Sequence, residues 1–519
     1  MALLGMTAGL AHVGPAVLRS GCLSGFDRIR ELFVIPKLDL VLVGVFTLIA
    51  GVLGALHLDQ QMRLDEASSF AMYASASPLV SLMTYDTPNN HILHSVLMWL
   101  SVTLFGPSEF SARLPAFAFS MLIPVCMLAA GRSILSPMIA LVGTGLYAGS
   151  VIGVDIATNA RGYPIVIVAM LILIGLLPAL RDRKPGVAIA AVVTGSIGFY
   201  ACPVMAYPIA FVYAGWLLMG PAKGTPLLEH VLGVVRTGFA TLVLVAFLYA
   251  PAWALSTGNG PVKTLGRAAQ GYRDSDGFLR FEELSFNLHA AWSQWTWPTP
   301  SLVAIALFAL ALSGIWMWLS RAGWPRALVA GLTLGTFGVY IVSGLAPPPW
   351  WIMVWFVPIL CFLWATPISM GAVLVSPKPV VAGATGLCAA VIASLGVILS
   401  GYPTDYPYRL GTKDAPQIVE HLAQGDPDAT HIVASPEVFR LLNFEFEKRG
   451  FGRQVVTPTS ELDKPSRDSV TYVRDVQADE LTVSEIFQSG FSAELELIDS
   501  TPIGDSVIDV YSIFPLGDE

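Results

Sequence analysis

Eleven stretches of mostly apolar residues, each about 20 residues long, run through the first 401 residues of this 519-residue chain. A helix needs about 20 such residues to cross the hydrocarbon core of a bilayer. Charged residues make up only 13% of the sequence, roughly half their share in soluble globular domains, which excludes a purely soluble enzyme and an intrinsically disordered chain. We therefore expect a polytopic α-helical membrane protein, with spans near 39–57, 112–131, 137–157, 162–180, 186–202, 203–220, 233–257, 299–320, 327–346, 350–371 and 379–401.

A twelfth apolar stretch at 91–105 is about 15 residues long, which suits an interfacial or re-entrant helix better than a span. With this stretch outside the bilayer and the N-terminus in the cytoplasm, the inner loops hold nine basic residues besides the four of the N-terminal tail. A span at 91–105 would turn all nine outward, so the positive-inside rule favours eleven spans. The nine are Arg132, Arg181, Arg183, Lys184, Lys223, Arg236, Arg321, Arg326 and Lys378.

This topology predicts three domains: a cytoplasmic N-terminal tail (1–38), a transmembrane domain (39–401) with outer loops at 58–111 and 258–298, and an extracytoplasmic C-terminal domain (402–519). The C-terminal domain carries 9 basic and 22 acidic residues, whereas residues 1–401 carry 20 and 15. Its patterns predict helices at 415–424 and 437–449 and strands at 430–434, 470–474 and 507–514. We expect a small α/β domain that acts as a lid or docking module without catalytic groups.

Two adjacent carboxylates, Asp65 and Glu66, follow the first span directly. The apolar residues of 67–83 are spaced for a helix lying flat on the membrane interface, which would hold Asp65 at headgroup depth. A carboxylate in that position could serve as a general base. A solvated loop start is the alternative.

A polar turn precedes the 91–105 stretch. Within it, His91 could donate to a phosphate or to an acceptor hydroxyl, while Asn89 and Asn90 are either substrate contacts or helix caps. His94 is expected to be structural.

Arg161 lies at the predicted outer end of the third span, followed closely by Tyr163. An arginine at membrane depth is costly unless it meets an anion or faces water, and its planar fork matches phosphate oxygens. Arg161 is thus a candidate phosphate ligand that Tyr163 could position. The alternatives are an ion pair with Asp155, a snorkelling arginine and an interfacial tyrosine.

The outer loop 258–298 adds basic and aromatic residues, including Arg267. They could bind a phosphate headgroup or belong to the interfacial belt.

The sequence has no Walker A loop, dinucleotide fingerprint or nucleophile elbow, no zinc-ligand spacing and no basic tract for nucleic acid. One acidic pair could bind Mg²⁺ or Ca²⁺, but no array of oxygen ligands accompanies it. An enzyme with its chemistry on the outer face has no access to cytoplasmic nucleotide sugars. It would need a donor that is already activated and tethered in the lipid.

The order of these features along the chain resembles that in the GT-C superfamily of integral membrane glycosyltransferases. Within it, the chain is most similar to the protein-mannosyltransferase-like and aminoarabinose-transferase-like branch. The resemblance rests on Asp65 and Glu66 after the first span, the polar turn, the interfacial helix, the basic inner turn and the end of the third span. It also rests on the run Gly106, Pro107, Ser108, Glu109, Phe110, Ser111, Ala112, Arg113, Leu114 and Pro115.

The resemblance implies a polyprenyl-phosphate-linked sugar donor and transfer to a glycan, lipid or protein acceptor on the outer face of the plasma membrane. In-line attack on such a phosphate-activated sugar predicts inversion at the anomeric carbon. It implies that Asp65 is the catalytic carboxylate, with Glu66 beside it, and that Arg161 lies close to the donor phosphate. His91 and Arg267 would add phosphate contacts, and Asn90 and Tyr163 would position substrate. No cofactor is expected. The competing functions are a transporter or flippase and a scaffold subunit.

Overall fold

The computed structural model describes residues 15–75, 77–85, 89–255, 354–375, 378–399, 415–424, 431–434, 439–449, 456–457, 469–475, 493–503 and 506–515. By its internal contacts the chain divides into two compact units. The first unit comprises Met1–His57, Leu82–His94 and Pro115–Thr404, and the second comprises Leu58–Ser81, Ser95–Leu114 and Asp405–Glu519.

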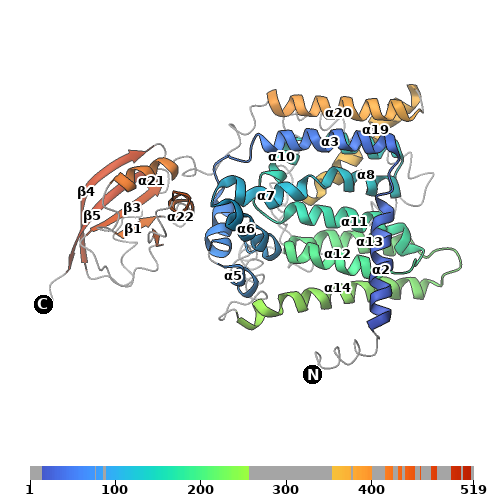
Figure 1. Ribbon diagram of the computed structural model, residues 1–519, viewed down its shortest axis with the longest axis horizontal. Helices are drawn as coiled ribbons and strands as arrows, with labels where there is room; N and C mark the ends of the chain where they lie inside the picture. Colours follow the sequence, from blue (N-terminus) through green and yellow to red (C-terminus); the bar gives the residue numbers. More distant parts are fainter. Residues whose placement is uncertain are drawn as a thin grey trace, which may run out of the picture. The chain divides into compact units, whose positions relative to one another are not determined.

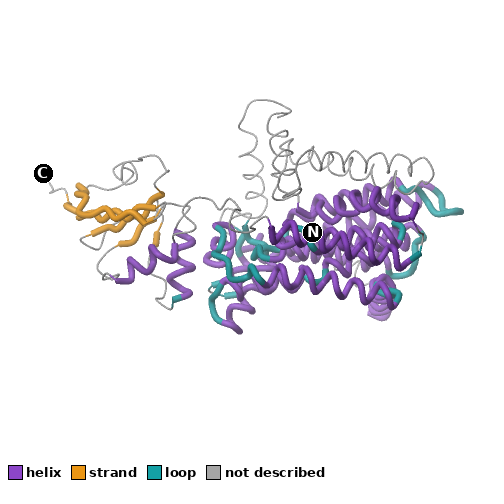
Figure 2. Tube along the Cα trace, turned by 90° about the horizontal axis from the view of Figure 1, so that it is seen from above, coloured by secondary structure: helices purple, strands orange, loops and turns teal. Residues whose placement is uncertain are grey.

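Long helices build the first unit, and most of them run alongside one another (Figures 1 and 2). Helix α2 instead crosses α11 and α12 at a steep angle, and Gly25 of α2 meets Gly186 at the start of α12 so closely that an added Cβ would lie 3.0 Å from the Gly186 carbonyl oxygen. The helices are α2 (Pro15–Leu32), α3 (Lys37–Ala55), α8 (Ile123–Ile134), α9 (Pro137–Ala148), α10 (Val151–Ala157), α11 (Tyr163–Arg181), α12 (Val187–Ala201), α13 (Ala206–Leu218), α14 (Leu227–Leu255), α19 (Val357–Val375) and α20 (Pro379–Leu399), with a short 3-10 turn, η2 (Pro203–Met205).

Among the described residues, four helical stretches are long and apolar enough to cross a membrane. They are α3, the stretch Glu109–Ile134, α11 and α14, and a fifth is reached if α9 and α10 count as one span bent by 67°. The bend follows Gly149, where Ser150 caps the new helix by accepting a hydrogen bond from the Gly153 N–H at 3.0 Å. Eleven spans stay a prediction, and those at 299–320 and 327–346 lie outside the described residues.

Burial distinguishes central helices from peripheral ones. In α11, 83% of an 18-residue apolar stretch is buried inside the protein, against 22% in α14 and 28% in α3. The peripheral helices expose large apolar side chains, such as Phe239 and Phe247 on α14 and Leu48 on α3. Apolar outer faces around a packed centre suit a helical protein surrounded by lipid. Small residues let α9 and α20 approach closely, because an added Cβ on Gly145 would lie 3.0 Å from the Gly386 carbonyl carbon.

Two short helices and a π-helical turn stand where one helix was predicted after the first span. The expected single helix at 67–83 is wrong: the structure has α4 (Leu64–Ser69), a π-helical turn η1 (Phe70–Ala74) and a separate α5 (Pro78–Met83). A proline begins a helix readily but interrupts one, which accounts for the new start at Pro78. Helix α6 (Ile92–Phe105) covers the twelfth apolar stretch and ends before Gly106, whose φ of +80° suits a helix C-terminus. Among the apolar helices, α6 belongs to those too short to cross a membrane.

The described C-terminal residues of the second unit form two helices and a five-stranded sheet, whose strands are orange in Figure 2. The strand order is β2-β1-β3-β5-β4; β1 runs parallel to β2 and β3, whereas β5 runs antiparallel to β3 and β4. Helix α22 packs on α21, and the Arg449 guanidinium donates to the Pro416 carbonyl at 3.1 Å. The elements are α21 (Ala415–Gln424), β1 (His431–Ala434), α22 (Phe439–Lys448), β2 (Val456–Thr457), β3 (Ser469–Asp475), β4 (Ala493–Ile503) and β5 (Ser506–Pro515).

Candidate active site

Asp65 is the second residue of α4 in the second unit, and its side chain is half-buried. Two local contacts fix the helix there. The Glu66 carboxylate reaches back to accept a hydrogen bond from the Arg63 backbone N–H at 2.8 Å, and the Ser69 hydroxyl donates to the Asp65 carbonyl at 2.9 Å. A glutamate three residues into a helix that satisfies the N-cap amide is a recognised capping contact. The backbone that carries the Asp65 carboxylate is therefore held on both sides.

Glu66 forms a fully buried ion pair with Arg113, which lies 47 residues further along the chain on helix α7 (Glu109–Ser120). The guanidinium binds both carboxylate oxygens: Nε donates to Oε1 at 3.0 Å and Nη2 donates to Oε2 at 2.7 Å. Such a two-point contact fixes the relative orientation of both groups. Both side chains are 0% exposed.

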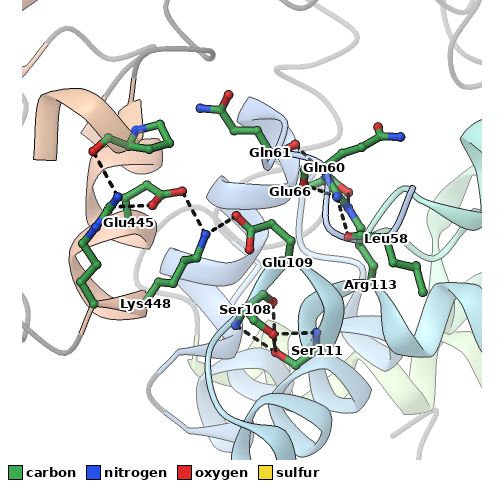
Figure 3. A network of polar contacts seen from close by, with 12 residues as sticks. Leu58, Gln60, Gln61, Glu66, Ser108, Glu109, Ser111, Arg113, Glu445 and Lys448 are labelled. Carbon is green, nitrogen blue, oxygen red and sulfur yellow. Dashed lines mark hydrogen bonds and ion pairs between the residues drawn. The ribbon is translucent and has the colours of Figure 1, made fainter. Parts of the chain in front are cut away.

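Arg113 also binds the backbone that leads into α4 (Figure 3). Its Nη1 donates to the carbonyls of Leu58, at 2.9 Å, and Gln60, and its Nη2 donates to the carbonyl of Gln61 at 2.9 Å. Together with the two bonds to Glu66, these contacts use all five N–H donors of the guanidinium. One arginine thus fastens the segment 58–61 and the start of α4 to α7.

The electrostatics of Glu66 follow from this pairing. Burial alone would raise its pKa, but the Arg113 charge and hydrogen bonds, with a smaller contribution from Arg63, lower it from 4.5 to about 2. Glu66 is therefore an ionised, fully engaged anchor. Its neighbour Asp65, half-buried rather than buried, is the carboxylate of the pair that lies nearer to solvent.

Arg161 belongs to a second polar cluster, which lies in the first unit. Its Nη2 donates to Asn89 Oδ1 at 3.0 Å, and its guanidinium carbon lies 5.2 Å from the centre of the Tyr163 ring. Arg161 is only 8% exposed and precedes α11, whose first turn contains Pro164. A guanidinium over a tyrosine face gains a cation–π contribution and a fixed plane.

His91 supports the Arg161 segment from the other side. Its Nδ1 accepts a hydrogen bond from the Gly162 N–H at 2.8 Å, so in the neutral ring the proton is on Nε2, which faces Cys202 Sγ at 3.5 Å and Arg161 Nη2 at 3.4 Å. Burial lowers the pKa of His91 well below its ordinary value, and the charge of Arg161 acts in the same direction. Neutral His91 thus places no second positive charge beside the arginine.

The remaining predicted residues also contribute to this cluster. The Tyr163 ring meets the His91 ring edge-to-face at 5.4 Å. Asn90 is buried, and its amide donates to the Thr84 carbonyl at 2.7 Å, which closes the polar turn. Gly162 approaches Ala201 so closely that an added Cβ would lie 3.0 Å from its carbonyl carbon.

The predicted site residues therefore fall into two groups, one in each unit: Asp65 with Glu66, and His91, Asn90, Arg161 and Tyr163. Arg267 lies outside the described residues. The sequence analysis assigned no role to Arg113. Its place in a largely apolar stretch could have pointed to one, because a buried arginine needs an anion beside it. Within the part of the chain that the structure describes, no group of three or more His, Cys, Asp or Glu side chains is arranged to hold a metal ion.

Comparisons with known proteins agree on one superfamily. The family model described as dolichyl-phosphate-mannose-protein mannosyltransferase matches residues 86–251, a range that includes the Arg161 cluster and Arg113 but not Asp65. No curated protein matches the chain.

Two similar solved structures are of ArnT from Cupriavidus metallidurans. The one bound to undecaprenyl phosphate has a TM-score of 0.55 at 14% identity, and the apo form has 0.56 at 13%; each match covers 90% of this chain and 97% of ArnT. The oligosaccharyltransferase of Archaeoglobus fulgidus, in complex with Zn and sulfate, matches with a TM-score of 0.53 at 11% identity, over 84% of this chain and 68% of that one.

The fold is thus that of a multi-pass helical membrane protein of the ArnT and oligosaccharyltransferase type. The family match and the fold together confirm the resemblance to the GT-C superfamily of membrane glycosyltransferases, in its branch similar to ArnT and the protein mannosyltransferases.

Proposed function

We propose that this protein transfers a sugar from a polyprenyl-phosphate-linked donor to an acceptor on the outer face of the plasma membrane, with Asp65 as general base. The observation that carries the proposal is the arrangement around Asp65: its neighbour Glu66 is buried and bound by Arg113, while Asp65 is half-buried on a fixed helix start. A catalytic group needs such a rigid backbone. The matching ArnT structure, which holds undecaprenyl phosphate, supports a lipid-phosphate donor.

The reaction balances with one base and one leaving group. Asp65 takes the proton of the acceptor hydroxyl as its oxygen attacks the anomeric carbon of the sugar. The bond from that carbon to the phosphate oxygen breaks, and its electron pair leaves with the polyprenyl phosphate. Attack opposite to the leaving group inverts the configuration at that carbon. A general base typically contributes about 10²–10⁴-fold to such a step.

Arg161 would stabilise the departing phosphate, because a planar cation binds two phosphate oxygens at once. Tyr163 and Asn89 hold its guanidinium. His91 and Asn90 position this segment through Gly162 and Thr84, and His91 and Arg267 are proposed as further phosphate contacts. Acceptors of three kinds fit this chemistry: a glycan, a lipid or a protein.

The proposed placement in the membrane follows from the charge distribution. Nine basic residues fall in the predicted inner loops, so we propose a cytoplasmic N-terminus and an extracytoplasmic C-terminal domain. Outer-face chemistry then uses a donor that is already in the lipid.

The Asp65→Asn variant tests the catalytic role. Asn keeps the size of the side chain but cannot accept the proton, so transfer from a polyprenyl-phosphate sugar should fall at least about 100-fold, with donor affinity unchanged. The matched control is Asp59→Asn, the same change at an exposed acid of the same segment, which should leave transfer unaltered. Near-normal turnover of Asp65→Asn would remove Asp65 from this role.

The Arg161→Ala variant tests the phosphate role. We expect weaker binding of the polyprenyl phosphate, measured directly on the purified protein, because the phosphate loses a charge-assisted contact. Unchanged affinity would assign Arg161 to structure alone.

A further inference from the structure

Helix α22 is buried over more of its circumference than a helix that packs on one side only. The five side chains Leu441, Leu442, Phe444, Glu445 and Phe446 are at most 2% exposed. At 3.6 residues per turn they cover roughly 200° of the helix, about twice the stripe of an ordinary surface helix. Helix α22 therefore packs on two sides, and only one of them faces α21.

The other side of α22 meets the helix that carries Asp65. The Phe444 ring packs edge-to-face on Phe70, with ring centres 5.0 Å apart and planes at 89°. Both rings are at most 1% exposed. Phe70 begins η1, five residues after Asp65, so this contact holds the residue that follows α4, whose start is held by Arg113.

A second contact joins α22 to the helix that carries Arg113 (Figure 3). The Lys448 ammonium lies 2.7 Å from Glu109 Oε1 and 3.7 Å from Glu445 Oε1. Glu109 is the first residue of α7, four residues before Arg113, and is 7% exposed. Ser108 accepts a hydrogen bond from the Ser111 N–H at 3.1 Å, which holds this helix start in place.

The Lys448 ammonium lies between two carboxylates. Glu445 is 2% exposed and is held on its other oxygen by Arg449 at 2.7 Å. Loss of the Lys448 charge would leave Glu109 and Glu445 facing each other, and like charges repel across the junction. Reversal of that charge would add a third carboxylate.

We propose that α22 is a positioning element for the reaction: Phe444 and Lys448 hold the segment 64–74 and the start of α7 in the geometry that catalysis requires. The inference rests on the proposed function. It gives the C-terminal segment a part in catalysis without a catalytic group, because a displacement of about 1 Å at a reacting group can cost about 100-fold in rate.

A charge exchange tests the proposal in the full-length protein. The variants are Glu109→Lys, Lys448→Glu and the double exchange, with Glu420→Lys, an exposed residue of α21, as the control for a change of charge in the C-terminal segment. Two quantities are measured on each: hydrogen exchange of the amides of residues 64–74, and kcat with donor affinity for transfer from a polyprenyl-phosphate sugar.

Each single variant should accelerate exchange in 64–74 and lower kcat about 10-fold with donor affinity unchanged, and the double exchange should restore both to within about threefold. A merely structural contact would alter exchange without lowering kcat, which would overturn the positioning role. If the double exchange leaves hydrogen exchange of 64–74 or kcat at the level of the single variants, the contact itself is overturned. If exchange responds and recovers but the wild-type protein transfers no sugar, the contact is supported and the proposed function is refuted.

Discussion

The buried pair of Glu66 and Arg113 makes a quantitative prediction. In Glu66→Gln the side chain keeps its shape but loses its charge, and an amide N–H₂ replaces one of the two oxygens that accept from Arg113 or Arg63. Arg113 then remains a buried cation with carbonyl partners only. Breaking a buried ion pair in this way costs about 3–5 kcal/mol.

The same substitution at Glu229 provides the matched control. Glu229 pairs with Arg183, but the two side chains are 52% and 51% exposed, and exposed pairs contribute about 0–1 kcal/mol. The structure therefore predicts a difference of at least about 2 kcal/mol between two chemically identical changes.

Hydrogen exchange of the backbone amides of residues 58–66 measures this difference locally. A loss of about 3 kcal/mol corresponds to exchange at least about 100-fold faster, if these amides open together. Glu229→Gln should leave them within a few-fold of the wild-type rate. Equal, small effects of both substitutions would refute the assignment of Arg113 and Glu66 as the anchor of this segment.

Three further predictions concern the same two clusters. Arg113→Lys keeps the charge but has three donors instead of five, so transfer should fall at least about 10-fold, measured as kcat, and full activity would contradict the five-bond anchor. Gly162→Ala should displace the Arg161 segment, because its Cβ would lie 3.0 Å from the carbonyl carbon of Ala201, and donor affinity measured by titration should fall; unchanged affinity would mean that this approach does not matter. Because the pKa of Glu66 is lower in the folded protein, ionised Glu66 contributes stability that is fully present above pH 4.5 and is lost as pH falls toward about 2. Unfolding midpoints followed from pH 6 to 3 should therefore drop more for wild type than for Glu66→Gln. Parallel curves would contradict the lowered pKa.

Hydrophobic length and periodicity predicted individual helices well. The predicted span at 162–180 corresponds to α11 (Tyr163–Arg181), and the predicted helix at 415–424 coincides with α21. Both are decided by local pattern: a long apolar run in one, an amphipathic stripe in the other. Strand β4 was not predicted, although Leu495 and Leu497 alternate with acidic residues there.

Backbone irregularities were harder to predict. The helix expected at 67–83 contains a π-helical turn and a new start at Pro78, and the span expected at 137–157 bends by 67° between α9 and α10. Apolar spacing records which face is buried, but it is insensitive to a break that keeps that face.

The sequence indicated candidate residues but not their contacts. Asp65, Glu66 and Arg161 stood out because charges near the membrane are costly. The partner of Glu66 is 47 residues away, and the Phe444 contact with Phe70 joins segments more than 370 residues apart. Such pairings depend on the tertiary fold, which no local pattern encodes.

Purified protein in sealed vesicles, supplied with a labelled polyprenyl-phosphate sugar and acceptor, tests the central claim most directly. Mass spectrometry of the products should find the sugar covalently joined to the acceptor, with inverted anomeric configuration and release of polyprenyl phosphate. Movement of intact donor or sugar across the vesicle membrane without any covalent product would contradict a glycosyltransferase and favour a transporter.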